Sequence, residues 1–80
     1  MSEETPPDAF ADLDTMACGD LMIALRRAMR PLDSGQVLRV HATDPGAPHD
    51  IPAWCRMTGH TLLGREGDAY HIRKRDDPDA

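Results

Sequence analysis

The feature that most constrains the fold is a change in the spacing of apolar residues on either side of Pro31. Over residues 20–30 the apolar side chains recur at helical spacing, and one side of the predicted helix carries Leu21, Leu25, Ala28 and Met29, with Met22 at its edge. Over residues 36–43 the period becomes two, because Leu38, Val40 and Ala42 alternate with polar neighbours. The pattern predicts an amphipathic helix that Pro31 ends, followed by a turn at residues 33–35 and a half-buried strand.

The second half of the chain predicts another helix and a hairpin. Residues 50–58 have helical spacing, with Gly59 as the stop residue and one face formed by Ile51, Trp54, Cys55 and Thr58. Asp44 is a good cap and proline fits a first helical turn, so this helix has an alternative, earlier start within residues 44–48. Strands are expected at residues 61–65 and 69–74, around a turn at residues 66–68. A short segment around Phe10 and Leu13 predicts one earlier strand.

These elements predict an α/β fold of the order β-α-β-α-β-β. Two helices can cover only one face of a four-stranded sheet, so we expect a two-layer sandwich with a mixed sheet and both helices on one side. A chain of 80 residues supports one domain with a small core. We assign that domain to residues 8–75, with a disordered N-terminal tail at residues 1–7 and an acidic C-terminal tail at residues 76–80.

Charge and residue usage disfavour several classes of function. The net charge is -5, and the basic residues are eight arginines and one lysine, which argues against direct nucleic-acid binding. No apolar run approaches the ~20 residues of a membrane helix, and the N-terminus does not resemble a signal peptide, so we expect a cytoplasmic protein with no membrane contact. The histidines, at positions 41, 49, 60 and 71, lack zinc-type spacing, so no metal site is expected.

The two cysteines differ in their positions relative to the predicted helices. Cys18 stands where the first helix opens, and free amides and the helix dipole at that end lower a thiol pKa, whereas Asp20 opposes this effect. Cys18 is therefore the candidate nucleophile; the alternative is a small apolar residue at a buried helix start. Cys55 shares a face with Ile51 and Trp54, so we expect it in the core, with a second carrier or resolving thiol as the alternative.

Four segments together resemble the TusA/SirA-like sulfur-carrier family over about residues 10–75, namely Cys18-Gly19-Asp20-Leu21, Asp44-Pro45, Asp50-Ile51-Pro52-Ala53-Trp54-Cys55 and Tyr70-His71-Ile72-Arg73-Lys74. The resemblance implies the two-layer fold and a sulfurtransferase-type carrier that holds sulfur as a persulfide on Cys18, without a cofactor. The family pattern at this cysteine is Cys-Pro-x-Pro, so this chain carries a variant motif. Expected partners are a protein sulfur donor and a protein acceptor, for a monomeric carrier. The alternative function is a non-catalytic interaction or regulatory module on the same fold.

The outward side of the first predicted helix is a candidate docking surface, which we call the arginine face. It consists of one apolar side chain among three basic ones: Ile23, Arg26, Arg27 and Arg30. An apolar contact surrounded by positive charge is typical of a small protein-docking patch, and a solvated helix face is the alternative. The pattern predicts that partners approach along this helix beside Cys18.

Overall fold

Strands and helices follow one another in the predicted order, β-α-β-α-β-β. The structure is a computed structural model that describes residues 6–15 and 18–76; most of the two predicted tails, residues 1–5 and 77–80, lies outside this part. The elements are β1 (Ala9–Asp14), α1 (Cys18–Met29), β2 (Val37–Ala42), α2 (Ala47–Thr58), β3 (Thr61–Glu66) and β4 (Ala69–Arg73).

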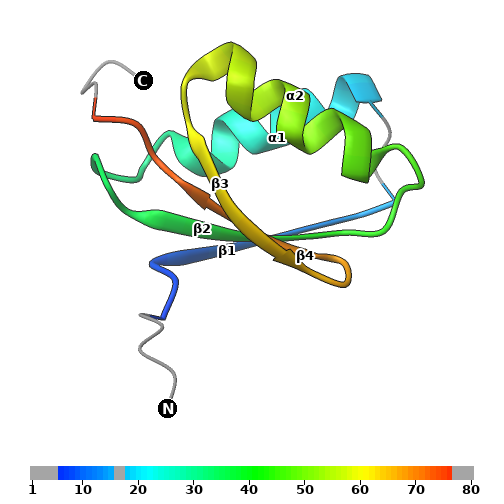
Figure 1. Ribbon diagram of the computed structural model, residues 1–80, viewed down its shortest axis with the longest axis horizontal. Helices are drawn as coiled ribbons and strands as arrows, with labels where there is room; N and C mark the ends of the chain where they lie inside the picture. The colour runs from blue at the N-terminus through cyan, green and yellow to red at the C-terminus, as the bar shows by residue number, and fades with distance from the viewer. Residues whose placement is uncertain (1–5, 16–17, 77–80) are drawn as a thin grey trace.

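The four strands form one mixed sheet in the order β1-β2-β4-β3. β1 runs parallel to β2, whereas β4 is antiparallel to both of its neighbours, β2 and β3. Both helices lie on the same side of the sheet, as Figure 1 shows. The parallel pair is the one joined through a helix, as a parallel connection requires. The molecule is the expected two-layer α/β sandwich.

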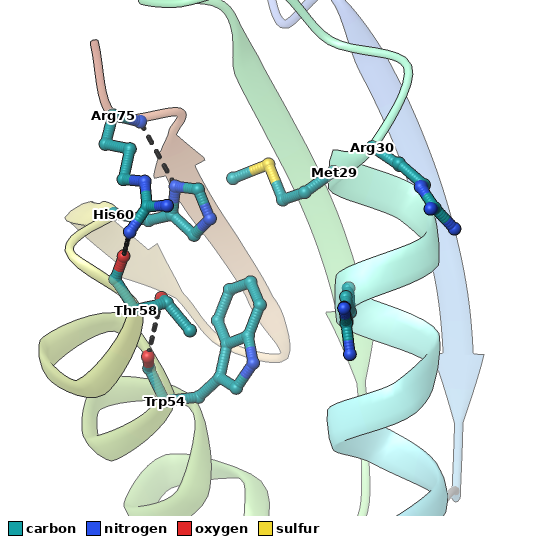
Figure 2. Close-up of a pocket in the computed structure, with 7 residues that line it drawn as sticks. Met29, Arg30, Trp54, Thr58, His60 and Arg75 are labelled. Carbon is teal, nitrogen blue, oxygen red and sulfur yellow. Dashed lines mark hydrogen bonds between the residues drawn. The ribbon is translucent and has the colours of Figure 1, made fainter. Parts of the chain in front are cut away.

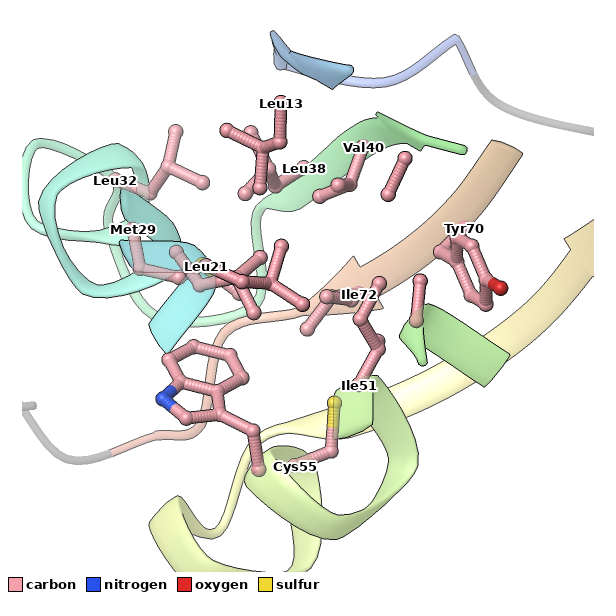
Figure 3. Packing of buried hydrophobic residues seen from close by; sticks show 14 residues of the cluster. Leu13, Leu21, Met29, Leu32, Leu38, Val40, Ile51, Cys55, Tyr70 and Ile72 are labelled. Atoms are coloured by element: carbon pink, nitrogen blue, oxygen red, sulfur yellow. The ribbon is translucent and has the colours of Figure 1, made fainter. Parts of the chain in front are cut away.

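The core fills the space between the helices and the covered face of the sheet (Figure 3). Alternate residues of β2 and β4 point into it, so Leu38 pairs with Ile72 and Val40 with Tyr70. The helices contribute the faces that their periodicity predicted, and the fully or almost fully buried members are Leu21, Leu25, Met29, Ile51, Trp54 and Cys55. Burial of these apolar side chains is the main contribution that holds the two layers together.

Both helices begin earlier than the strict apolar period predicts. α1 begins at Cys18 rather than at residue 20, and α2 begins at Ala47 rather than at residue 50. Pro48 occupies the first turn of α2, where its missing N–H breaks no helical hydrogen bond. The N-cap of α2 is Gly46, and Asp44 instead accepts a hydrogen bond from the amide of Gly46 at 2.9 Å. Gly59 ends α2 in the left-handed conformation, as predicted.

The opposite face of the sheet carries no helix and presents polar side chains together with the exposed Phe10. Arg39 pairs with His71 across β2 and β4, and His41 lies 3.2 Å from the carboxylate of Asp12 on β1. These side chains are exposed or half-buried, which fits the half-buried strand pattern of the sequence. Neither helix of the described part is long and apolar enough to cross a membrane.

Candidate functional site

Cys18 is the first residue of α1. The amides of a first helical turn have no partner within the helix, and they carry the positive end of its dipole. Asp20 lies in the same turn and is exposed, as is Gly19. The side chain of Cys18 lies outside the described part of the structure, so its accessibility stays a prediction.

The end of β1, just before this helix, is held by the end of β2. Asp14 has a φ of 48°, the left-handed region that aspartate tolerates better than most residues. Its carbonyl accepts a hydrogen bond from the amide of Thr43 at 2.8 Å, and its carboxylate accepts one from the Thr43 hydroxyl at 3.5 Å. These contacts fix the point where the chain leaves the sheet on its way to Cys18.

The other end of α1 is capped by Lys74, which follows β4. Its ammonium group donates hydrogen bonds to the carbonyls of Met29 at 3.1 Å, Arg30 at 3.3 Å and Leu32. Lys74 is only 3% exposed, and three acceptors satisfy its three donors. The alternating pattern predicts Lys74 as part of the last strand, but β4 ends at Arg73, and the capping role of the one lysine in the sequence was not predicted.

Cys55 is a core residue, as predicted. It is 3% exposed, and its sulfur points toward Ile51 and the sheet in Figure 3. Burial raises the pKa of the Cys55 thiol to about 11, and the nearby charge of Arg56 opposes this rise only in part. Only a very small fraction of Cys55 is thiolate near neutral pH, so its nucleophilicity is low.

The arginine face forms one exposed stripe on α1, because its members are spaced three or four residues apart. Ile23 is 54% exposed, and the three arginines are exposed. The three arginines were predicted as equivalent members of this face, but their surroundings in the structure differ. Arg26 and Arg30 line a cavity of about 270 Å³ against the end of α2, whereas Arg27 does not.

This cavity contains polar groups that the sequence analysis did not identify as a site. His60 and Trp54 form its inner wall, with ring centroids 5.2 Å apart and planes tilted by 32° (Figure 2). The His60 Nδ1 accepts a hydrogen bond from the amide of Arg75 at 3.1 Å. Burial lowers the pKa of His60, and the charges of Arg75 and Lys74 lower it further. From the sequence, His60 was considered only as a possible metal ligand. Its contact with Trp54 depends on how the turn at Gly59 places the chain after α2, which the local sequence pattern does not show.

Within residues 6–15 and 18–76 no group of three or more histidine, cysteine, aspartate or glutamate side chains is placed to hold a metal ion. The histidines of this part lie on different elements. His60 is in the cavity between the helices, whereas His41 and His71 lie on the uncovered face of the sheet.

Comparison with known proteins identifies the family of this chain. The model of a family described as "Sulfurtransferase TusA" matches residues 10–75. The "Putative sulfur carrier protein YrkI" of Bacillus subtilis is 44% identical over an alignment of 63 residues that covers 76% of this chain and 84% of that protein. The "Sulfur carrier protein TusA" of Pseudomonas putida is 40% identical over an alignment of 75 residues that covers 89% of this chain and 94% of that protein. The chain belongs to the TusA family of sulfur carriers.

Proposed function

We propose that this protein carries sulfur as a persulfide on Cys18 and relays it from a protein donor to a protein acceptor. The observation that carries the proposal is the position of Cys18 as the first residue of α1 in a chain of the TusA family. A helix N-terminus stabilises a thiolate, and the thiolate is the form of cysteine that attacks sulfur.

The proposed transfer conserves atoms and electrons. The Cys18 thiolate attacks the outer sulfur of a donor persulfide, and a new S–S bond forms while the donor S–S bond breaks. The donor leaves as a thiolate, and Cys18 now carries the outer sulfur as its own persulfide. An acceptor thiolate then attacks that outer sulfur, and Cys18 leaves as a thiolate. The relay has no net oxidation and requires no metal or organic cofactor.

Free thiols are a condition of this chemistry. Both Cys18 and the thiols of its partners must stay reduced between transfers, which is the normal state of thiols in the cytosol. The proposal therefore includes a cytoplasmic location and a carrier that acts as a monomer, because the site needs residues from only one chain.

We further propose that donor and acceptor dock on the arginine face. At about 1.5 Å of rise per residue, Ile23 lies roughly 8 Å along α1 from Cys18, and Arg30 roughly 18 Å. A partner whose thiol reaches Cys18 can therefore also cover this stripe. Ile23 would supply an apolar contact, and Arg26, Arg27 and Arg30 would attract an acidic partner surface.

The test of the carrier role is sulfur loading measured by intact mass. After incubation with a persulfide donor, wild-type protein and Cys55→Ser should each gain one sulfur atom, whereas Cys18→Ser should gain none. Full loading of Cys18→Ser with loss in Cys55→Ser would mean that the other thiol is the carrier. Absence of loading in all three proteins would instead favour the non-catalytic interaction module, for which the glycine at position 19 is the supporting observation.

The test of the docking surface is the rate of transfer from a cognate protein donor. Arg26→Glu combined with Arg30→Glu should slow transfer more at low salt than at high salt, because screening weakens steering by exposed charges. The matched control is Arg39→Glu combined with Arg73→Glu, which makes the same charge change on the uncovered face of the sheet. Equal transfer rates for both double variants and the wild type would mean that the arginine face is only a solvated surface with no role in docking.

A further inference from the structure

The cavity between the ends of α1 and α2 has a lining that can donate hydrogen bonds to a ligand from several sides. Figure 2 shows it between the last turn of α1, with Met29 reaching inward, and the pair Trp54 and His60 on the other side. Its charged lining residues are Arg26, Arg30 and Arg75, and no acidic side chain of the described residues lines it. At about 270 Å³ it is slightly smaller than the ~300–1,000 Å³ of typical organic-ligand pockets. The cavity therefore suits a small, negatively charged ligand.

His60 places one donor on the lining of this cavity. Its Nδ1 accepts the hydrogen bond from the Arg75 amide, so the proton of the neutral ring is on Nε2. In Figure 2 the second ring nitrogen faces across the cavity toward Met29. No group within the described ranges accepts a hydrogen bond from it, although His60 is only 8% exposed. The nitrogen is not itself fully buried, so this N–H is an unpartnered donor that a ligand in the cavity can reach.

Trp54 places a second donor on the cavity lining. The indole Nε1–H can only donate a hydrogen bond. Trp54 is 4% exposed, and among residues 6–15 and 18–76 its Nε1 has no acceptor. In Figure 2 the nitrogen edge of the indole faces α1. The N–H groups of the two rings therefore lie at different parts of the cavity lining, with the indole nitrogen on the side of Trp54 away from His60.

The helix ends would by themselves repel an anion, because each carries about half a negative charge. Here cationic side chains offset both ends. Lys74 binds the last carbonyls of α1, and the guanidinium of Arg75 donates to the carbonyl of Thr58 at the end of α2. Arg26 adds a full positive charge from the flank of α1 that faces α2. The balance of charge around the cavity is positive.

We propose that this cavity binds a small tetrahedral oxyanion of the sulfate, thiosulfate or phosphate class. The Nε2–H of His60 would bind one oxygen of the anion, and the Arg26 guanidinium would bind it from the cavity mouth. The site is separate from Cys18, which lies roughly 12 Å from Arg26 along the axis of α1. The inference does not depend on sulfur carriage.

The experiment uses Trp54 as its own reporter, because it is the only tryptophan of the chain. The full chain carrying Cys18→Ser, which prevents any reaction of thiosulfate at that thiol, is titrated separately with sodium sulfate, thiosulfate and phosphate. Sodium chloride at the same ionic strength is the reference. We expect a saturable change in fluorescence with a Kd of about 1 mM or tighter for at least one of the three anions. The order of the three affinities identifies the preferred anion.

Two arginine variants separate a specific site from general charge screening. Arg26→Gln should weaken binding about tenfold, since it removes a charged hydrogen-bond donor. Arg56→Gln is the matched control, because Arg56 is exposed on α2 and does not line the cavity. It should bind like the parent. The His60 Nε2–H resonance should also shift during the titration. A response no larger than that to chloride, or equal weakening in both variants, would overturn the proposal, and sulfur loading of the wild type would be unaffected by that result.

Discussion

The two helices have the same length, twelve residues, and each carries one cysteine, but they place it differently. In α1 the cysteine is the first residue, where backbone amides are free. In α2 it is Cys55, well inside the helix and turned toward the core, where burial raises its pKa to about 11. The contrast teaches that burial suppresses thiolate formation at Cys55, whereas Cys18 begins its helix beside free backbone amides.

The helices also end in different ways. The last carbonyls of α1 are bound by the buried ammonium of Lys74, which is distant in sequence. α2 ends locally, through the left-handed conformation of Gly59, whose amide donates to the carbonyl of Cys55. The end of α1 therefore depends on the docking of the chain after β4, whereas the end of α2 depends on one backbone conformation.

The largest expected effects are losses of stability in two variants, one at the end of each helix. Lys74→Met should lower the free energy of unfolding by about 2–4 kcal/mol, because it leaves buried carbonyls without their charged donor. Gly59→Ala should cost about 1–2 kcal/mol, the penalty for a left-handed alanine. Urea unfolding followed by circular dichroism measures both. A larger loss for Gly59→Ala would show that the lysine contributes little to α1.

The next contrast compares the cysteines as structural residues. Cys55→Ser should destabilise the protein by about 1–3 kcal/mol, because a hydroxyl replaces a thiol in an apolar environment. Cys18→Ser should change the stability by less than about 0.5 kcal/mol, since serine is well suited to a helix N-terminus. Thermal unfolding of both variants provides the comparison. Equal destabilisation would contradict the difference in environment that the account assigns to them.

A smaller effect is expected from making the start of α1 resemble that of α2. α2 has proline as its second residue, Pro48, where α1 has Gly19. Apart from its chain neighbours and the backbone of its own helix, no atom of the described residues lies within 4 Å of the position of a Cβ at Gly19. Gly19→Pro should therefore keep the fold and stabilise it by about 0.4–1 kcal/mol through the unfolded state. A large fall in melting temperature would mean that the amide or backbone angles of Gly19 are required.

The smallest expected effect is on the pH dependence of stability, through His60 just after the end of α2. The pKa of His60 is lowered by burial in the folded state, so the unfolded chain binds the proton more readily. The contribution of His60 is fully present above its unfolded pKa of about 6.5, and it is lost as pH falls through the folded pKa. His60→Gln should reduce the loss of stability between pH 7 and pH 5 in chloride buffers. An unchanged slope would exclude His60 as its source.

Periodicity predicted the fold because the covered and uncovered faces depend on residues close together in sequence. The spacing of Leu21, Leu25 and Met29 was sufficient to predict which face of α1 is buried. Gly59 was sufficient to predict where α2 ends. The bond from Lys74 to Met29 joins residues 45 positions apart, and the cavity joins Arg26 to His60. Such contacts depend on how the elements dock, so local patterns did not reveal them.

The most direct test of the central claim maps persulfide sulfur in the wild-type protein, which contains both cysteines. The folded protein is incubated briefly with a persulfide donor and then digested, and a second sample is treated in denaturant. We predict sulfur on the Cys18 peptide alone in the folded sample and on both cysteine peptides in the unfolded one. Sulfur on Cys55 in the folded protein, at a level equal to or above that on Cys18, would contradict the account.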